Sequence, residues 1–150
     1  YLAKAAELQP DRASGDAAGA SALNLARQTL KDPMSRAEAL LARLGGPAPS
    51  RDKSLPAGFL PEILDVRERL EAAIASGDAT ERARWEAWAE DRRRTHIATI
   101  GRLFDEHRAG ADAGPANGAA LKSVRLELNV WRYTERVLEQ LNGTEAGAGL

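Results

Sequence analysis

Residues 23–46 predict two helices that meet at a sharp bend at Asp32-Pro33. Proline lacks the backbone N–H that a continuous helix needs, and it pushes the preceding residue out of the helical region. Asp32 is therefore expected to cap the second helix, with Pro33 at its first position. That helix should end at Gly45-Gly46, where a left-handed C-cap is easily formed. Because each helix has an apolar stripe, both must bury a face against something.

The composition narrows the possible functions. The chain has 150 residues with a net charge of -1, enough for one modest core or two small ones. The near-neutral balance argues against nucleic acid as a partner. There is no cysteine, so disulfides, thiolate metal sites and a cysteine nucleophile are excluded. No apolar run is long enough to span a bilayer and no signal peptide is visible, so we expect a cytoplasmic protein with no membrane partner.

The N-terminal part predicts short helices with breaks between them. Residues 1–8 are typical of the end of a helix, and a break follows at Gln9-Pro10-Asp11. Residues 14–20 are expected to form a disordered loop. Because the chain begins at Tyr1 rather than methionine, we expect residues to be missing in front of it.

A linker rich in proline, glycine and serine follows at residues 47–58. Beyond it, a helix over residues 59–76 places Phe59 and four further apolar residues on one core stripe. Leu60 and Leu64 fall together on one edge of this stripe, beside acidic residues. Either the wide stripe faces two neighbours within the fold, or these leucines form an exposed patch for a partner. The other stripe residues are Ile63, Val66, Leu70 and Ile74.

Two more helices complete the second half of the chain. One begins at Asp78, which has capping-box spacing, and runs to about residue 108. Three consecutive arginines at residues 92–94 point in different directions around it, which favours a solvated face. The last helix, residues 119–141, is apolar on two sides, so one side should face the N-terminal part or a partner. Residues 110–118 predict a flexible turn. The residues expected to be buried on the first of these helices are Trp85, Trp88, Ile100, Leu103 and Phe104.

No motif predicts catalysis. The sequence contains no phosphate-binding loop, no dinucleotide-binding turn and no serine or acid tied to a base. His96 and His107 are expected to be ordinary surface or packed histidines, since a metal site would need further ligands near them. We therefore predict a protein that is not an enzyme and uses no cofactor or metal.

Two stretches carry a resemblance to a known family. In the first, Pro33 and Gly45 bracket a segment that reads R-A-E-x-L-L. In the second, residues 59–68 read F-L-P-E-I-L-D-V-R-E. Both stretches resemble the HscB-type J-domain co-chaperones of iron–sulfur cluster assembly. The matching residues are Pro33, Arg36, Ala37, Glu38, Leu40, Leu41 and Gly45, then Phe59, Leu60, Glu62, Leu64, Asp65, Val66, Arg67 and Glu68.

The resemblance implies an all-α fold, a partial J-domain helical hairpin followed by a three-helix bundle. It implies a partial J-like domain at residues 1–46 and a scaffold-binding bundle at 59–142, on either side of the linker at 47–58. The composition of residues 143–150 predicts a disordered tail. The resemblance also implies a co-chaperone adaptor that binds an iron–sulfur scaffold protein and presents it to a DnaK-type chaperone ATPase. By the matching motifs, the scaffold-binding residues would be Leu60, Leu64, Asp65, Glu68 and Tyr133.

The chaperone-binding loop departs from the family pattern. J-domains have a His-Pro-Asp tripeptide that engages the ATPase, and here it reads Gln9-Pro10-Asp11, with Lys4 as the basic residue before it. Glutamine has no titratable ring nitrogen, which puts ATPase stimulation in doubt. Two alternatives follow from the sequence. The chain is a J-like docking module without ATPase stimulation, or it is a helical structural protein that self-associates through the spare face of its last helix.

Overall fold

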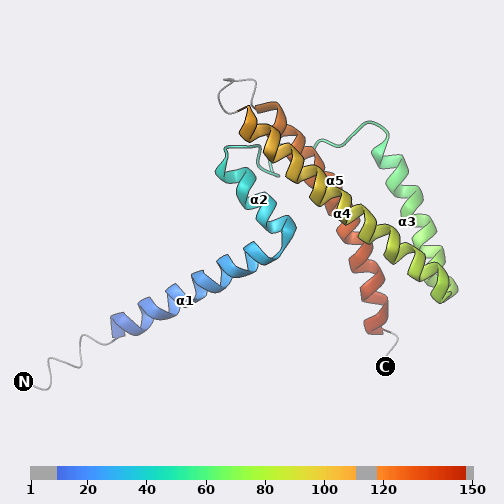
Figure 1. The fold of residues 1–150 in the computed structure, drawn as a ribbon. Coiled ribbons are helices and arrows are strands. Elements are labelled where there is room, and N and C mark those ends of the chain that lie inside the picture. Colours follow the sequence, from blue (N-terminus) through green and yellow to red (C-terminus); the bar gives the residue numbers. More distant parts are fainter. Residues whose placement is uncertain (1–9, 111–117, 148–150) are drawn as a thin grey trace, which may run out of the picture. The chain divides into compact units, whose positions relative to one another are not determined.

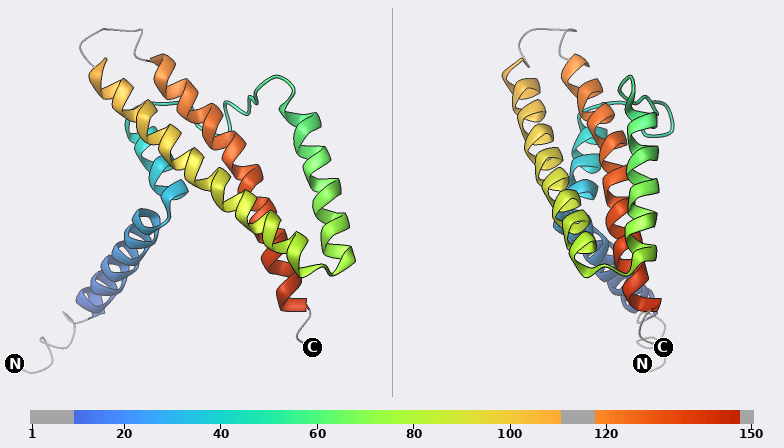
Figure 2. Two further views of the ribbon diagram at one scale, coloured as in Figure 1. Left: turned by 45° about the vertical axis from the view of Figure 1, so that its right-hand side comes forward. Right: turned by 90° about the vertical axis from the view of Figure 1, so that its right-hand side faces the viewer.

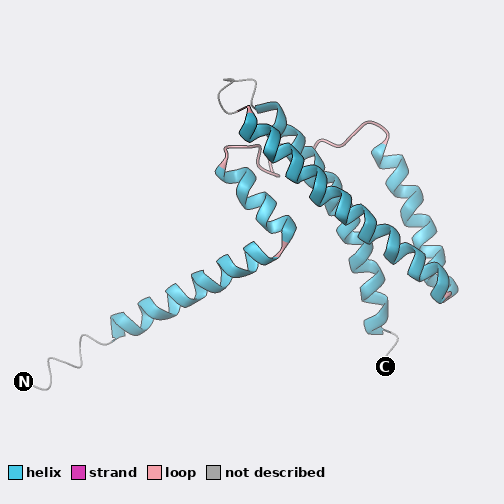
Figure 3. Cartoon of the chain, viewed as in Figure 1, coloured by secondary structure: helices cyan, strands magenta, loops and turns pink. Residues whose placement is uncertain are grey.

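The computed structural model describes residues 10–110 and 118–147. These residues form five helices, shown in Figure 1. No strand occurs in this part of the chain (Figure 3), which confirms the predicted all-α fold. None of the helices described here combines the length and the apolar character that a bilayer crossing requires. The helices are α1 (Pro10–Lys31), α2 (Pro33–Arg43), α3 (Phe59–Ser76), α4 (Ala79–Ala109) and α5 (Gly118–Gly147).

The chain divides into two compact units, residues 1–39 and residues 40–150. In the first unit, the predicted bend is confirmed, because α1 ends at Lys31 and α2 begins at Pro33. The backbone N–H of Ser35 donates to Oδ2 of Asp32 at 2.7 Å, so Asp32 is the N-cap of α2. The Arg36 side chain donates to the carbonyl oxygen of Leu30 across the bend at 3.2 Å.

The predicted end of α2 is also confirmed. Its last helical residue is Arg43, and Gly45 has a φ of +78°, in the left-handed region that glycine adopts without a steric penalty. The N–H of Gly46 then donates to the carbonyl oxygen of Leu41 at 2.9 Å. A Cβ on Gly46 would collide with the Leu41 side chain, so this position requires glycine for packing.

Helix α1 is longer than the sequence predicted. The loop expected at residues 14–20 is wrong, since α1 runs without interruption from Pro10 to Lys31. Of the break expected at Gln9-Pro10-Asp11, Pro10 and Asp11 are helical and begin α1, while Gln9 lies outside the described residues. Proline is well suited to the first helical position, because its missing N–H needs no intrahelical acceptor there. Alanine has the highest helix propensity, and the alanines of residues 13–20 offset the two glycines among them. Residues 1–8, with the predicted helix end, lie outside the described residues.

The second unit is built on α4 and α5. These two helices run antiparallel and lie side by side in the views of Figures 1 and 2, and α3 contacts both. The core gathers Leu70 of α3, Ala89 of α4 and three residues of α5, while Val66, Ile74, Trp85 and Trp88 pack against it from the edge. The predicted core stripe of α3 is thereby confirmed. The three buried residues of α5 in this cluster are Val137, Leu138 and Leu141.

The two apolar sides of α5 differ in burial. One predicted face is buried throughout: Leu121, Val124, Leu128, Trp131 and Leu138. On the other face Val137 and Leu141 are buried, whereas Leu126, Val130 and Tyr133 are half-buried. The helix continues to Gly147, so the prediction of a disordered tail is wrong for residues 143–147. Extending an existing helix needs no new nucleus, which explains the continuation. Residues 148–150 and 111–117 lie outside the described part.

The turn between α3 and α4 has the predicted cap. Oδ1 of Asp78 accepts hydrogen bonds from the backbone N–H of Thr80 at 2.8 Å and of Glu81 at 3.3 Å. Gly77 precedes it with a φ of 67° and ends α3. A single tight turn therefore fixes α3 beside α4.

A buried polar network joins α4 to α5. Nδ1 of His96 lies 2.6 Å from Oε1 of Glu127, and Nε2 lies 3.0 Å from the Thr134 hydroxyl. The His96 ring stacks on Trp131, with ring centroids 6.0 Å apart. His96 is thus a packed histidine, one of the two roles expected for it. Because each polar group needs its specific partner, the network fixes the register of the two helices.

Candidate partner-binding surface

The two leucines singled out in the sequence are exposed on α3. Leu60 has 52% and Leu64 has 56% of its surface exposed, whereas Ile63 has 7% and Leu70 has none. The structure therefore agrees with an exposed patch rather than with a stripe buried against two neighbours. Leu60 and Leu64 are one helical turn apart, so they form a continuous apolar ridge. We call these two residues the leucine ridge.

The carboxylates near the leucine ridge do not all share its face. A helix turns about 100° per residue, which places Glu68 directly above Leu64 and turns Asp65 to a different side. Asp65 instead forms an ion pair with Arg69 at 2.9 Å. Arg67 and Glu71, 3.9 Å apart, share the side of the ridge. Of the predicted residues on α3, Leu60, Leu64 and Glu68 thus lie together, and Asp65 lies apart.

Tyr133 of α5 lies next to the same side of α3. Its ring packs edge-on to Phe59, with ring centroids 5.3 Å apart. The guanidinium of Arg136 lies over the Tyr133 ring at 5.3 Å from its centroid. Ile63 and Arg67 of α3 line a groove together with Tyr133 and Arg136. The sequence analysis matched Arg67 to the family motif without assigning it a contact, and it did not single out Arg136. Their spacing of three residues from Leu64 and Tyr133 could have indicated both.

The loop at residues 47–58 is fixed on α5 by hydrogen bonds. Nε of Arg125 donates to the carbonyl oxygen of Pro47 at 2.9 Å. Nδ2 of Asn129 donates to the carbonyl oxygens of Asp52 and Ser54, at 3.1 Å and 3.0 Å. The segment whose composition predicted a linker is therefore a loop anchored on α5, and this loop borders the groove around Tyr133.

Within this loop the carboxylate of Asp52 is stabilised by its neighbours. The Ser54 hydroxyl and the Ser54 backbone N–H donate to it, and together they lower the pKa of Asp52. The positive charges of Arg125 and Lys122 act in the same direction, while burial opposes them.

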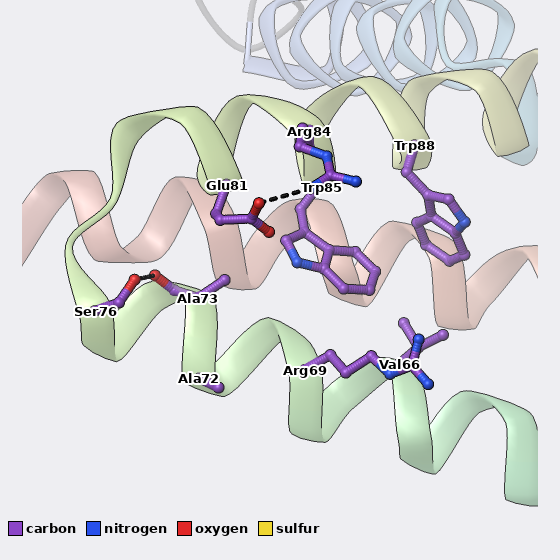
Figure 4. Close-up of a pocket in the computed structure, with 9 residues that line it drawn as sticks. All are labelled: Val66, Arg69, Ala72, Ala73, Ser76, Glu81, Arg84, Trp85 and Trp88. Carbon is purple, nitrogen blue, oxygen red and sulfur yellow. Dashed lines mark hydrogen bonds and ion pairs between the residues drawn. The ribbon is translucent and has the colours of Figure 1, made fainter.

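A second groove lies between α3 and α4, on another side of the unit. Figure 4 shows Trp85 and Trp88 of α4 pointing toward Val66, Ala72 and Ala73 of α3. The two indole rings are nearly perpendicular, with centroids 5.5 Å apart. An ion pair between Glu81 and Arg84, at 2.6 Å, lies at the rim. No residue predicted as a site from the sequence lines this groove.

The arginines at residues 92–94 point in three directions, as predicted, and each has an acidic partner. Arg92 faces Glu62 at 3.5 Å and lies over the Trp88 ring. Arg93 binds Glu135 at 2.6 Å, and Arg94 faces Asp91 at 3.3 Å. They consequently form ion pairs, Arg92 and Arg93 to other helices and Arg94 within α4.

The predicted chaperone-binding residues lie in the other unit. Pro10 and Asp11 form the start of α1, while Lys4 and Gln9 lie outside the described residues. The predicted chaperone-binding loop therefore stays a prediction.

The buried network has the order of a catalytic triad: hydroxyl, imidazole and carboxylate. Thr134, His96 and Glu127 supply these groups. However, Thr134 and His96 are each 4% exposed, so a substrate could not reach the hydroxyl. The three side chains instead link α4 to α5. Among residues 10–110 and 118–147, no group of three or more His, Asp or Glu side chains is placed to hold a metal ion.

Comparison with known proteins places the bundle in a family. The family model described as the HSCB C-terminal oligomerisation domain matches residues 55–142. The Co-chaperone protein HscB homolog of Burkholderia thailandensis is 31% identical over 97% of this chain and 83% of its own length. The chain belongs to the HscB co-chaperone family. The resemblance seen in the sequence is thereby confirmed.

Other relatives agree with this assignment. The Co-chaperone protein HscB homolog of Burkholderia mallei is 30% identical over 97% of this chain and 83% of its own length. That of Chromobacterium violaceum is 41% identical over 54% of this chain and 51% of its own length. No solved structure matches this HscB-family chain. The domain matched by the family model contains the leucine ridge and Tyr133.

Proposed function

We propose that this chain is a co-chaperone adaptor that binds an iron–sulfur cluster scaffold protein and presents it to a DnaK-type chaperone ATPase. The observation that carries the proposal is the leucine ridge. More than half of the surface of Leu60 and of Leu64 is exposed on a helix whose other side is buried. Adjacent exposed leucines mark a binding surface, and this one lies within the domain that the family model matches.

In this function the leucines anchor the scaffold. Burying each leucine contributes about 1.5–3 kcal/mol, which makes such residues dominant in an interface. Glu68 provides a charged rim on the same face as the leucine ridge. Tyr133 lies on the flank of α3 that carries Phe59 and Ile63. Asp65 contributes from a neighbouring side. The chaperone contact is assigned to Lys4, Gln9, Pro10 and Asp11. An adaptor that holds scaffold and chaperone together raises the effective concentration of one at the other.

Calorimetric titration with an iron–sulfur scaffold protein from the same source tests the proposal. We expect a Leu60→Ser, Leu64→Ser variant to bind at least about thirtyfold more weakly than the unaltered chain. A matched control is Leu23→Ser, Leu25→Ser, because these leucines of α1 are also exposed, at 72% and 66%. The control should bind like the unaltered chain. Absence of binding by the folded, unaltered chain would refute the proposal.

A second candidate is a docking module that binds the client without stimulating the ATPase. The glutamine at position 9 favours it, because the family pattern has histidine there. A Gln9→His variant should then gain stimulation of ATP hydrolysis by a DnaK-type chaperone, measured at steady state. Equal stimulation by both chains would remove this candidate.

Self-association is the third candidate. The matched family model is described as an oligomerisation domain, and the half-buried side of α5 offers apolar surface. Sedimentation velocity over a wide concentration range measures it. A strictly monomeric chain would exclude it.

A further inference from the structure

The groove between α3 and α4 is lined by aromatic and small apolar side chains. Trp85 and Trp88 of α4 form one wall, and Val66, Ala72 and Ala73 of α3 form the other (Figure 4). The hollow between the two walls has a volume of about 650 Å³. Both tryptophans are half-buried and Ala72 is exposed, so the groove is open to solvent. We call it the tryptophan groove.

This groove has the side chains of a protein interface. Tryptophan is among the residues that contribute most to binding between proteins, because its ring buries a large apolar area. The alanines of α3 leave room opposite the two indole rings, and every described residue that lines the groove belongs to α3 or α4. An apolar ridge from another molecule would fill this room and remove the rings from water.

The leucine ridge lies on the opposite side of the same helix. Ala73 follows Leu64 by nine residues, and Arg69, at the groove, follows Leu60 by nine. Nine residues are about two and a half turns of an α-helix, so the members of each pair point in opposite directions. One copy of the chain therefore cannot place its own ridge in its own groove, whereas a second copy can.

The charges at the edges of the two surfaces are compatible. At the groove, Arg84 pairs with Glu81 at 2.6 Å and Arg69 pairs with Asp65 at 2.9 Å. The four side chains are all at least 42% exposed, and such exposed pairs contribute little to stability. These arginines can therefore exchange partners at an interface without a large loss. Glu68, on the face of the leucine ridge, supplies a carboxylate of the sign that fits them.

We propose that the tryptophan groove of one copy binds the leucine ridge of a second copy. Both surfaces lie within residues 55–142, and the family model that matches these residues is described as an oligomerisation domain. The exposed leucines of α1 lie outside that match, which favours the ridge as the occupant. Because each copy has one ridge and one groove, the contact is head-to-tail and adds copies in series.

This inference goes beyond the proposed function and sets the two in competition. A leucine ridge that is held in the groove of another copy cannot hold a scaffold protein. Self-association therefore keeps the chain in a form that does not bind the client, and an excess of scaffold should release single copies. Sedimentation velocity of the chain with and without scaffold measures this release.

Two variants used together test the contact. Ala72→Arg fills the groove at an exposed helical position, and Leu60→Ser, Leu64→Ser removes the ridge. In sedimentation velocity we expect each variant alone to self-associate at least about tenfold more weakly than the unaltered chain. In an equimolar mixture, the intact ridge of the first variant fits the intact groove of the second. The mixture should therefore form pairs and no larger species.

The matched control is Ala83→Arg. It makes the same substitution at an exposed alanine of α4 that does not line the groove, so it should associate like the unaltered chain. Tryptophan emission gives a second readout. Association should shift the emission of Trp85 and Trp88 to shorter wavelength, while Trp131, which is 2% exposed, contributes a constant signal.

Three results would overturn the inference. The unaltered chain is monomeric over a wide concentration range, the Ala72→Arg variant associates as strongly as the Ala83→Arg control, or the mixture of folded variants forms no pairs. Association that Ala72→Arg leaves unchanged would point to the half-buried side of α5 instead. Circular dichroism of each variant establishes that it is folded.

A scaffold titration separates this inference from the proposed function. The Ala72→Arg variant keeps the leucine ridge, so it should bind the scaffold at least as tightly as the unaltered chain. If it does so while the mixture forms no pairs, the inference fails and the function stands. If the mixture forms pairs while the scaffold does not bind, the function fails and the inference stands.

Discussion

The two sides of α3 contain the same residue type in opposite surroundings. Leu70 is completely buried against α4 and α5, whereas Leu64, less than two turns away, is 56% exposed. Both leucines belong to a helix with the same local propensity, so only their angular position differs. The comparison shows that the direction of a leucine, rather than its presence, decides whether it serves the core or a surface.

This difference separates stability from binding. Truncating a core leucine removes buried apolar area and leaves a cavity, so it lowers the free energy of unfolding. Truncating an exposed leucine changes the free energy of unfolding little and is expected to act on partner binding instead. The predictions below test that separation from the largest expected effect to the smallest.

Leu70→Ala is expected to lower the free energy of unfolding by about 2–5 kcal/mol, because the Leu70 site is closed on all sides. Leu64→Ala is the matched control and should change it by no more than about 0.5 kcal/mol. Urea unfolding followed by circular dichroism measures both. Equal losses in the two variants would mean that the ridge is part of the core.

His96→Ala tests the α4–α5 platform on which the buried side of α3 rests. The substitution leaves Glu127 and the Thr134 hydroxyl without their partner, and we expect a loss of about 1–3 kcal/mol in the free energy of unfolding. Ile97→Ala provides the control, since Ile97 is the next residue and is 39% exposed. A His96→Ala chain as stable as the control would show that the network contributes nothing to the platform.

The smallest effect concerns the loop that leads into the exposed side of α3. Since folding lowers the pKa of Asp52, the stabilisation is present above the unfolded value of 3.8 and is lost as pH falls through the folded value. An Asp52→Asn variant should therefore lose less stability than the unaltered chain between about pH 5 and pH 3. Urea midpoints at several pH values measure this, and parallel curves for the two chains would contradict the assignment.

The sequence predicted most of the helices of the second unit and the bend of the first. Periodicity located α3 and its core stripe, and the proline, glycine and aspartate signals located the bend and both caps, because these depend on local chemistry. The length of α1 and the continuation of α5 were missed. In both places alanine-rich or polar residues extend a helix although glycines suggest a break.

The candidate surface was predicted only in part. The leucine ridge follows from angular position along one helix. The approach of Tyr133 and Arg136 to Arg67 depends on how α5 packs beside α3, and a helical wheel contains no such information. The hydrogen bonds that anchor the loop likewise join residues more than seventy positions apart.

The way this loop is anchored has a consequence for its freedom to change. Arg125 and Asn129 bind carbonyl oxygens of the main chain, which every amino acid carries. Side chains of the loop can therefore change during evolution without detaching the loop from α5. The charge that the loop presents to a partner can change in the same way with little effect on the fold. The two side chains on α5 have no such latitude. Replacing Arg125 removes the hydrogen bond to Pro47, and replacing Asn129 removes those to Asp52 and Ser54, whatever the sequence of the loop.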